Sequence, residues 1–341
     1  MPATPSNAQG PGDRIENETE LIQTYLAPLS RGAPGAFGLR DDAALISPEP
    51  GTDIVVTSDP IIAGVHFFPT DSPADVAWKA LAVNASDLAA KGAKPLAYIL
   101  TLALPEAPAR EWMAKFAEGL RSAQETFGCH LIGGDTDVTP GPLSIGVTIM
   151  GSVPAGKFVR RQNASVGDHV FVTGTIGDAA LGLAVRHDPS AFAKVLTDDD
   201  RAFLLDRYLH PKPRLALADT LQANASAALD ISDGLLKDLS RLAGPLGFSL
   251  ELGKVPLSNA GRAALAHDSN VAQAILAGGD DYELVIAVPP ASVAGFTRGA
   301  AETGVQVSDL GTLTADPAVK ILGFDGTPID VERFGYDHFS R

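Results

Sequence analysis

Residues 228–238 read ALDISDGLLKD, and this stretch decides how the second half of the chain is interpreted. An apolar run ends at Asp230 and a helical apolar pattern begins near Gly234, which predicts a strand, a tight turn and a helix. We expect Ser232 or Asp233 to cap that helix, whose first N–H groups suit a phosphate. Asp230 needs another explanation, because a carboxylate ending an apolar strand is poorly solvated unless a cation lies beside it.

Carboxylates among small and apolar residues recur along the chain. They stand in the segments GLRDDAALI, VVTSDPI, VNASDLAAKG, LIGGDTD and AGGDDYEL. Mg²⁺ takes oxygen ligands and is usually held by a few carboxylates together with substrate phosphates. The set therefore predicts a magnesium–nucleotide site.

One of these carboxylates lies inside an expected helix, at residues 74–92. Asn84, Asp87 and Lys91 share one face of that helix, at positions i, i+3 and i+7. The flanking residues are Ala, Val and Leu, so little of the helix is expected to meet water, and its polar stripe needs partners. The alternative is a surface ion pair between Asp87 and Lys91, worth about 0.3–0.5 kcal/mol.

Composition narrows the class of protein. At 341 residues, two domains are the default, and a net charge of −15 argues against a nucleic-acid partner. No apolar run reaches the length of a membrane span, and the single Cys129 excludes a cysteine-based zinc site. The N-terminal stretch 1–15 lacks the features of a secretory signal and is expected to be a disordered tail in a cytoplasmic protein.

Helical and strand-like patterns mix irregularly, which favours an α+β fold with domains at 16–152 and 153–341. Helices are expected at 16–29, 74–92, 108–127, 178–187, 198–209, 213–225, 234–244, 259–268 and 291–303. Strands are expected at 53–59, 97–105, 130–135, 144–153, 169–174, 228–233, 248–253, 282–289 and 319–326. Each half carries a Ser-Asp element followed by a Gly-Gly-Asp turn. This repetition indicates either two related acidic half-sites or a coincidence, since Gly and Asp are common in turns.

Two glycine-rich stretches imitate nucleotide-binding loops. Residues 151–157 satisfy GxxxxGK, but Phe158 follows where a phosphate-binding loop needs Ser or Thr, and no helix start follows. We interpret 151–168 as a linker. Residues 174–177 lack the full G-x-G-x-x-G and are interpreted as a strand-to-helix connection.

Taken in order, the acidic motifs resemble those of the thiamine-monophosphate kinase family, in the superfamily of aminoimidazole ribonucleotide synthetase and selenophosphate synthetase. The resemblance runs from about residue 18 to the C-terminus. It is carried by Asp41-Asp42, Thr57-Ser58-Asp59, Gly64-Val65-His66-Phe67, Asn84-Ala-Ser-Asp87, Gly133-Gly134-Asp135, Thr173-Gly174 with Gly177-Asp178, Asp230-Ile-Ser-Asp233, Gly278-Gly279-Asp280-Asp281 and Gly335-Tyr336.

The resemblance implies two α+β domains with the active site in the cleft between them, and a homodimer formed through the N-terminal domains. It also implies the ligand-binding residues. Those for Mg²⁺ are Asp42, Thr57, Ser58, Asp59, Asp87, Asp135, Asp230 and Asp233. Those for ATP are Gly134, Asp135, Arg161 and Ser232, and those for thiamine phosphate are His66, Asp280 and Tyr336. Arg40, Asp137 and Asp280 depart from the usual family pattern, the last being a shorter acid than the usual Glu.

The reaction implied is transfer of the γ-phosphoryl group of ATP to thiamine monophosphate, which ends thiamine diphosphate synthesis. The acceptor phosphate, with a second pKa of about 6, is already mostly dianionic at neutral pH, so no catalytic base is expected. Another enzyme of the superfamily is the nearest rival. However, Cys129 is misplaced for a selenophosphate synthetase, and the ending HFSR lacks the cysteine of the carbamoyl-dehydratase relatives. Two alternatives come from other classes of protein: a non-catalytic sensor that binds magnesium and nucleotide, and a structural acidic protein.

Overall fold

The computed structural model describes residues 14–337 and 339. The chain forms two compact units, each assembled from several segments. Unit 1 comprises Met1–Ser47, Ser58–Leu81 and Leu96–Ile149, and unit 2 comprises Pro48–Thr57, Ala82–Pro95 and Met150–Arg341. The division therefore passes through single strands and through one long helix, and does not fall at one point of the chain.

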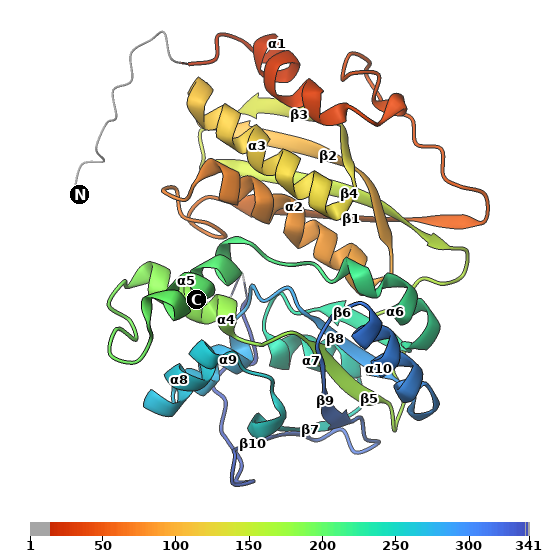
Figure 1. Ribbon diagram of the computed structural model, residues 1–341, viewed down its shortest axis with the longest axis vertical. Coiled ribbons are helices and arrows are strands. Elements are labelled where there is room, and N and C mark those ends of the chain that lie inside the picture. Colours follow the sequence, from red (N-terminus) through yellow and green to blue (C-terminus); the bar gives the residue numbers. More distant parts are fainter. Residues whose placement is uncertain (1–13, 338, 340–341) are drawn as a thin grey trace. The chain divides into compact units, whose positions relative to one another are not determined.

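A four-stranded sheet organises the first half of the chain (Figure 1). Its strands are β1 (Thr52–Ile62), β2 (Lys94–Leu104), β3 (His130–Val138) and β4 (Ser144–Pro154), in the order β1-β4-β2-β3. Helices α2 (Pro73–Ala90) and α3 (Arg110–Phe127) cover one face of this sheet. Strands β2 and β3 are parallel, and α3 makes the connection between them.

Helix α3 follows from a regular apolar spacing. Its buried residues recur every three or four positions and include Met113, Phe116, Leu120 and Phe127. Such spacing places them on one face of a helix. The helix ends at Gly128, whose φ of +75° is a left-handed conformation that suits glycine.

The sheet of unit 2 is antiparallel and covered on both faces. Its strands are β5 (His169–Thr173), β6 (Ala227–Asp230), β8 (Leu284–Val288) and β9 (Val307–Thr312), in the order β6-β8-β5-β9. All five residues of β8 are buried, and alternate ones enter two different core clusters. Because successive strand residues point to opposite faces, this continuous apolar run requires a layer on each side.

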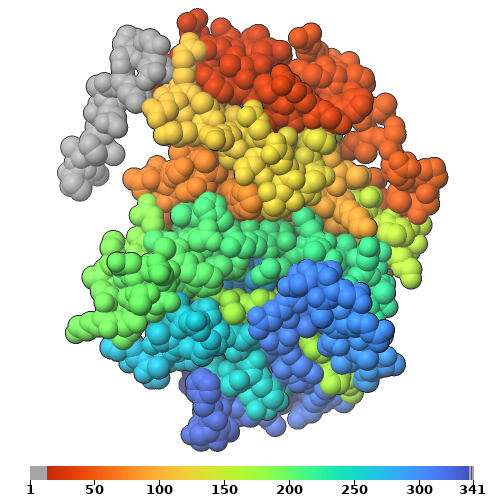
Figure 2. Space-filling view, viewed as in Figure 1, coloured from red at the N-terminus to blue at the C-terminus, as the bar shows by residue number. Residues whose placement is uncertain are grey.

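Helices and a second small sheet supply those layers. Strands β7 (Phe248–Glu251) and β10 (Val319–Leu322) pair in parallel. The space-filling view shows α8, in cyan, and α10, in blue, at the surface of unit 2 (Figure 2). The helices are α4 (Asp178–His187), α5 (Asp198–Leu209), α6 (Ala218–Asn224), α7 (Leu235–Ala243), α8 (Asn259–His267), α9 (Val271–Ala277) and α10 (Val293–Glu302).

Most expected elements are present, and two were not predicted. Helix α9 and strand β9 were missed, because α9 is a short run of seven residues directly before a glycine turn and β9 contains Ser, Asp and Gly. The first expected helix is broken into α1 (Glu18–Leu21), a π turn and a 3₁₀ turn that ends at Ser30. The expected tail lies outside the described residues except for Arg14 and Ile15. These two are ordered, since Arg14 forms an ion pair with Glu106 and Ile15 is buried.

Two further predictions concern membrane spans and Cys129. No helix in the described part of the chain is long and apolar enough to cross a membrane. Cys129 is buried, and burial raises the pKa of its thiol to about 12, so it behaves as a small apolar residue.

The approach of α3 to α2 gives a test of the packing. A Cβ atom added to Gly119 would lie 2.3 Å from the carbonyl oxygen of Ala74, a distance that forces the backbones apart. We expect Gly119→Ala to lower the free energy of unfolding by about 1–3 kcal/mol, although alanine favours a helix. Urea unfolding measures the change.

Gly261→Ala in α8 is the matched control. Its new Cβ would meet no atom closer than 3.4 Å, so we expect no loss, or a gain of up to about 1 kcal/mol. Equal behaviour of the two variants would contradict the close approach of α2 and α3.

Candidate functional site

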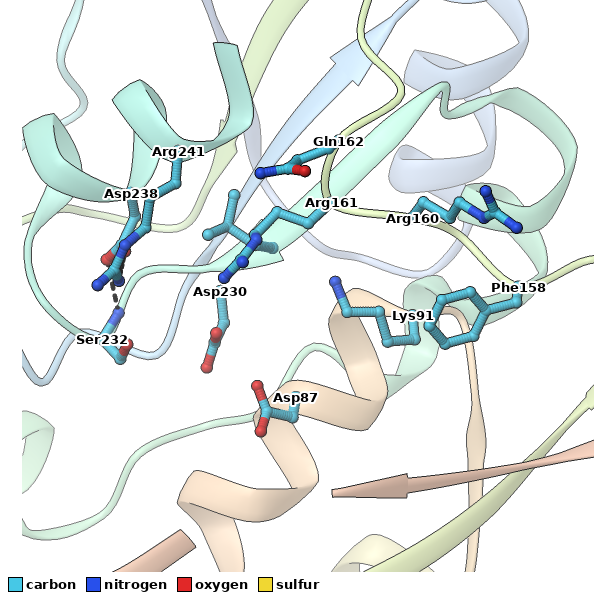
Figure 3. Close-up of a pocket in the computed structure, with 11 residues that line it drawn as sticks. Asp87, Lys91, Phe158, Arg160, Arg161, Gln162, Asp230, Ser232, Asp238 and Arg241 are labelled. Atoms are coloured by element: carbon cyan, nitrogen blue, oxygen red, sulfur yellow. Dashed lines mark hydrogen bonds and ion pairs between the residues drawn. The ribbon is translucent and has the colours of Figure 1, made fainter. Parts of the chain in front are cut away.

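A polar pocket of about 560 Å³ opens in unit 2. Three segments line it: the last turns of α2, the loop that follows β4, and the connection from β6 into α7 (Figure 3). The lining residues are Asp87, Lys91, Phe158, Arg160, Arg161, Gln162, Leu229, Asp230, Ser232, Asp238 and Arg241.

Two carboxylates form the acidic side of the pocket. Asp87 projects from α2 and Asp230 ends β6, and Figure 3 shows their carboxylates directed toward one another. Burial raises the pKa of Asp230 well above its usual range, and the neighbouring charge of Asp87 raises it further. Asp87 also accepts a hydrogen bond of 2.5 Å from the hydroxyl of Thr57. Three of the predicted metal ligands therefore lie together.

Cationic side chains also line the pocket. Lys91 follows Asp87 by one helical turn and donates a hydrogen bond of 2.8 Å to the carbonyl oxygen of Ala228. Burial lowers the pKa of Lys91, while the charges of Asp230 and Asp87 raise it. Arg160, Arg161 and Arg241 also line the pocket. Of the helix stripe predicted around Asp87, Asn84 is buried and Asp87 and Lys91 are half-buried in the pocket, so the stripe is not a surface ion pair.

The donor set fits a hard divalent cation bound to phosphate. Two facing carboxylates repel one another, and a metal ion placed beside them removes that repulsion. The arginine and lysine groups of the same pocket suit phosphate oxygens. In the described part of the chain, no group of three or more Asp, Glu, His or Cys side chains is already gathered as a metal site. Phosphate oxygens would then have to complete the coordination.

The turn between β6 and α7 is held by a residue that we did not predict. The buried carboxylate of Asp238 accepts hydrogen bonds from the backbone N–H groups of Ser232 and Asp233, at 3.1 and 2.9 Å. The expectation that Ser232 or Asp233 caps the helix is therefore wrong. Gly234 occupies the cap position without a side-chain bond, and Asp238 reaches back from inside the helix.

The same turn connects to two predicted substrate residues. The carbonyl oxygen of Ser232 accepts the N–H of Asp280, and that of Asp233 accepts the N–H of Tyr336, both at 2.9 Å. Gly279 permits the first contact, because a Cβ there would lie 2.2 Å from the oxygen of Ser232. The structure thus brings Ser232, Asp233, Asp280 and Tyr336 together around one turn.

Asp233 is engaged by two cations. Its carboxylate lies 2.9 Å from the ammonium group of Lys237 and 2.7 Å from the guanidinium group of Arg241. Arg241 also bonds Asp238 at 2.8 Å. A metal ion at Asp233 would therefore compete with cations that the protein itself supplies.

The remaining predicted residues belong to unit 1. Asp42, Asp59 and Asp135 are exposed, the last two on β1 and β3. The hydroxyl of Ser58 lies 2.8 Å from that of Thr148, and His66 accepts the N–H of Ile62 through Nδ1 at 3.0 Å.

Glycine is required at one of these positions. Gly134 faces Leu100 of β2, whose carbonyl oxygen would lie 1.8 Å from a Cβ at position 134. No larger residue fits this contact without moving the neighbouring strand.

The sheet order separates two of the predicted metal ligands. Asp59 lies on β1 and Asp135 on β3, and these are the two edge strands of the sheet. Three inter-strand spacings give a backbone separation of roughly 14 Å. Because Mg²⁺ holds its ligands at about 2.1 Å, the two carboxylates of one chain do not reach the same ion.

The acidic motif at 278–283 contains structural as well as candidate residues. Asp281 is buried and accepts the N–H of Gly177 at 2.8 Å. Glu283 is buried between the guanidinium groups of Arg207 and Arg214 and accepts the hydroxyl of Thr173 at 2.5 Å. Asp281 thus connects the motif to the loop after β5, and Glu283 connects it to β5 and α5.

The stretch that we interpreted as a linker contributes half of the pocket residues that sequence reasoning missed. It supplies Phe158, Arg160 and Gln162 to the pocket beside the predicted Arg161. The adjacent arginines in an otherwise acidic chain were the available signal. No helix lies between β4 and β5 in the described chain, as expected from the lack of a helix start after 151–157.

Comparisons with known proteins agree on the family. Residues 40–153 match the family model described as AIR synthase related protein, N-terminal domain. A thiamine-monophosphate kinase of Caulobacter vibrioides is 38% identical, over 97% of this chain and 94% of the relative.

Solved structures are also similar. Thiamine-monophosphate kinase from Stenotrophomonas maltophilia is 36% identical with a TM-score of 0.79, over 90% of this chain and 95% of that one. AaThiL complexed with AMPPCP and TMP is 30% identical with a TM-score of 0.73, over 94% and 97% of the two chains. Together with the acidic motifs and the pocket, these similarities show that the chain belongs to the thiamine-monophosphate kinase family, on an AIR synthase-related fold.

Proposed function

We propose that this protein transfers the γ-phosphoryl group of ATP to the phosphate of thiamine monophosphate, the last step of thiamine diphosphate synthesis. The observation that carries the proposal is the pocket in which Asp87 and Asp230 face Lys91 and Arg161. Facing carboxylates suit metal ions, and the adjacent cations suit the phosphates that those ions accompany. The similar chain bound to AMPPCP and TMP supports both substrates.

We assign the metal and nucleotide residues as the resemblance implied. The proposed Mg²⁺ ligands are Asp42, Thr57, Ser58, Asp59, Asp87, Asp135, Asp230 and Asp233. Gly134, Asp135, Arg161 and Ser232 are the proposed ATP contacts. Bound Mg²⁺ supplies charge neutralisation and alignment of the reacting phosphates. Arg161 and Lys91 would add to this by attracting phosphate oxygens from the other side of the pocket.

No side chain is assigned to proton transfer. The acceptor phosphate has a second pKa of about 6 and is mostly ionised at neutral pH, so it needs no base. His66, Asp280 and Tyr336 are the proposed contacts to thiamine monophosphate. Asp280 would attract the cationic thiazolium ring, and its backbone conformation, with φ of +70°, fixes the direction of its side chain.

A homodimer formed through the N-terminal domain, 16–152, is part of the proposal. The edge-strand positions of Asp59 and Asp135 support it, because a metal shared by both residues needs one of them from a second copy. Exposed apolar side chains on the strands of that sheet, among them Val56 and Val138, also suit a covered face. The domain at 153–341 would complete the nucleotide and substrate sites. The cytoplasm is the proposed compartment, because the reaction consumes ATP.

Product analysis tests the reaction. We expect purified protein incubated with ATP, Mg²⁺ and thiamine monophosphate to form thiamine diphosphate and ADP in equal amounts, and neither when the metal is chelated. ADP formed only with another phosphorylated or acyl acceptor would move the protein to a different activity of the superfamily. Metal-dependent ATP binding without turnover would identify a sensor.

Asp230→Asn tests the metal assignment. Because burial and Asp87 disfavour the charged carboxylate, we expect the amide to stabilise the metal-free protein by about 1 kcal/mol. Turnover should nevertheless fall about a hundredfold or more, because a metal ligand is lost. Thermal unfolding in chelator and steady-state rates measure the two effects.

Glu118→Gln, at an exposed position in the middle of α3, also replaces a carboxylate with an amide; it is the control and should change neither quantity. If Asp230→Asn lowers both stability and turnover, Asp230 serves the fold and the metal assignment is wrong.

Mixing two inactive variants tests the shared site. Asp59→Asn and Asp135→Asn should each be inactive alone. Unfolded and refolded together in equal amounts, they should recover about a quarter of wild-type activity, because half the dimers are mixed and each mixed dimer has one intact site. Mixtures that stay inactive would indicate that each site takes both carboxylates from one chain.

A further inference from the structure

We propose that Lys237 is a positioning residue for the acceptor substrate. Its side chain connects the carboxylate of Asp233 to the C-terminal segment that carries Tyr336. Lys237 matches none of the family motifs and is assigned to neither ligand. The inference rests on the proposed function for the roles of Asp233 and Tyr336.

The ammonium group of Lys237 has two partners. It forms an ion pair with the carboxylate of Asp233, one helical turn earlier, at 2.9 Å. It also donates a hydrogen bond to the carbonyl oxygen of Tyr336. A lysine ammonium group has three donors, so both bonds exist at once.

The main chain of residue 336 is therefore held from both sides. Its N–H is bonded by the carbonyl oxygen of Asp233 at 2.9 Å, and its carbonyl oxygen by Lys237. Two bonds to one residue fix the direction in which its side chain leaves the backbone. Because Asp233 and Lys237 supply one bond each, the position of Tyr336 depends on both.

Close packing restricts where this segment can lie. A Cβ atom at Gly335 would lie 2.6 Å from the carbonyl oxygen of Asp233 and 2.6 Å from Cβ of Lys237. Glycine at 335 therefore lets the chain lie directly against the first turn of α7. Without the bond from Lys237, the segment would lose one of the backbone attachments that hold it at this point.

The C-terminal segment has a second attachment to the protein that does not involve Lys237. Gln273 of α9 donates to the carbonyl oxygen of Arg333 at 2.8 Å and accepts the N–H of Glu332 at 3.2 Å. The segment would thus stay near the protein when Lys237 is replaced, while residues after Arg333 become mobile. Loss of Lys237 should consequently affect the substrate that Tyr336 meets more than it affects folding.

Lys237 also competes with metal for Asp233. Both are cations that seek the same carboxylate, which is about one-fifth exposed. Without the lysine charge, Arg241 still lies 2.7 Å from that carboxylate, but an incoming metal ion displaces less positive charge. The two consequences have opposite signs: weaker acceptor binding and easier metal binding.

The experiment compares Lys237→Met and Lys237→Arg with the wild-type protein. For Lys237→Met we expect the KM for thiamine monophosphate to rise about tenfold, the effect of one lost charge-assisted hydrogen bond at a partly exposed site. The KM for ATP and kcat should stay within about twofold, and the Mg²⁺ concentration for half-maximal rate should fall. Lys237→Arg keeps the charge and the donors and should restore most of the acceptor KM.

A readout without turnover completes the test. Trypsin cleavage after the exposed Arg333 should be faster in Lys237→Met, as followed by peptide mass, because the chain beyond that residue is less restrained. Lys115→Met removes another i, i+4 ion pair, with Glu111 in α3, and should change none of these quantities.

The proposal is wrong if Lys237→Met leaves both the acceptor KM and the cleavage rate unchanged, or if kcat falls with no change in that KM. A wild-type protein without turnover would refute the proposed function alone, because the cleavage rates still test the hold of Lys237 on the segment.

Discussion

The mutual repulsion of the Asp87 and Asp230 carboxylates is the constraint on which the rest of the site depends. Both project into one pocket, and burial makes the charged form of Asp230 costly. Lys91, which directly follows the helix that carries Asp87, offsets part of this cost, and arginines from the loop after β4 add positive charge to the pocket. The result is a pocket whose charges are balanced only in part, which is the condition for binding a metal ion together with an anion.

The turn at 231–234, which follows Asp230, is bonded to several other parts of unit 2. Its N–H groups are bonded by Asp238, and its carbonyl oxygens bond the chain at Asp280 and Tyr336. These backbone groups are therefore all used within the protein. A small movement of the turn would shift Ser232, Asp233, Asp280 and Tyr336 together, so those proposed contacts that lie at this turn of unit 2 behave as one assembly.

Features that depend on residues close together in the sequence were predictable, whereas contacts between residues far apart in the sequence were not. The strand and helix around Asp230 and the buried stripe around Asp87 followed from apolar patterns and residue types. The cap did not, because Asp238 reaches backward and local preference favoured Ser232 or Asp233. Nor did the order of the sheet, which places Asp59 and Asp135 on opposite edges, since a linear pattern carries no information about strand neighbours. Arg160 and Gln162 were missed because the loop after β4 has no periodic apolar pattern.

The division of the chain affects how the protein can be cut. Unit 2 takes in residues 82–95, and within it Gln222 donates to the carbonyl oxygen of Gly92, while Ala90 belongs to the core around Phe296. A fragment that begins at Met150 would lack this piece of helix and expose an apolar surface in its place. During synthesis, residues 82–95 leave the ribosome long before their partners. This helix end must therefore wait, incompletely covered, until the last third of the chain has emerged.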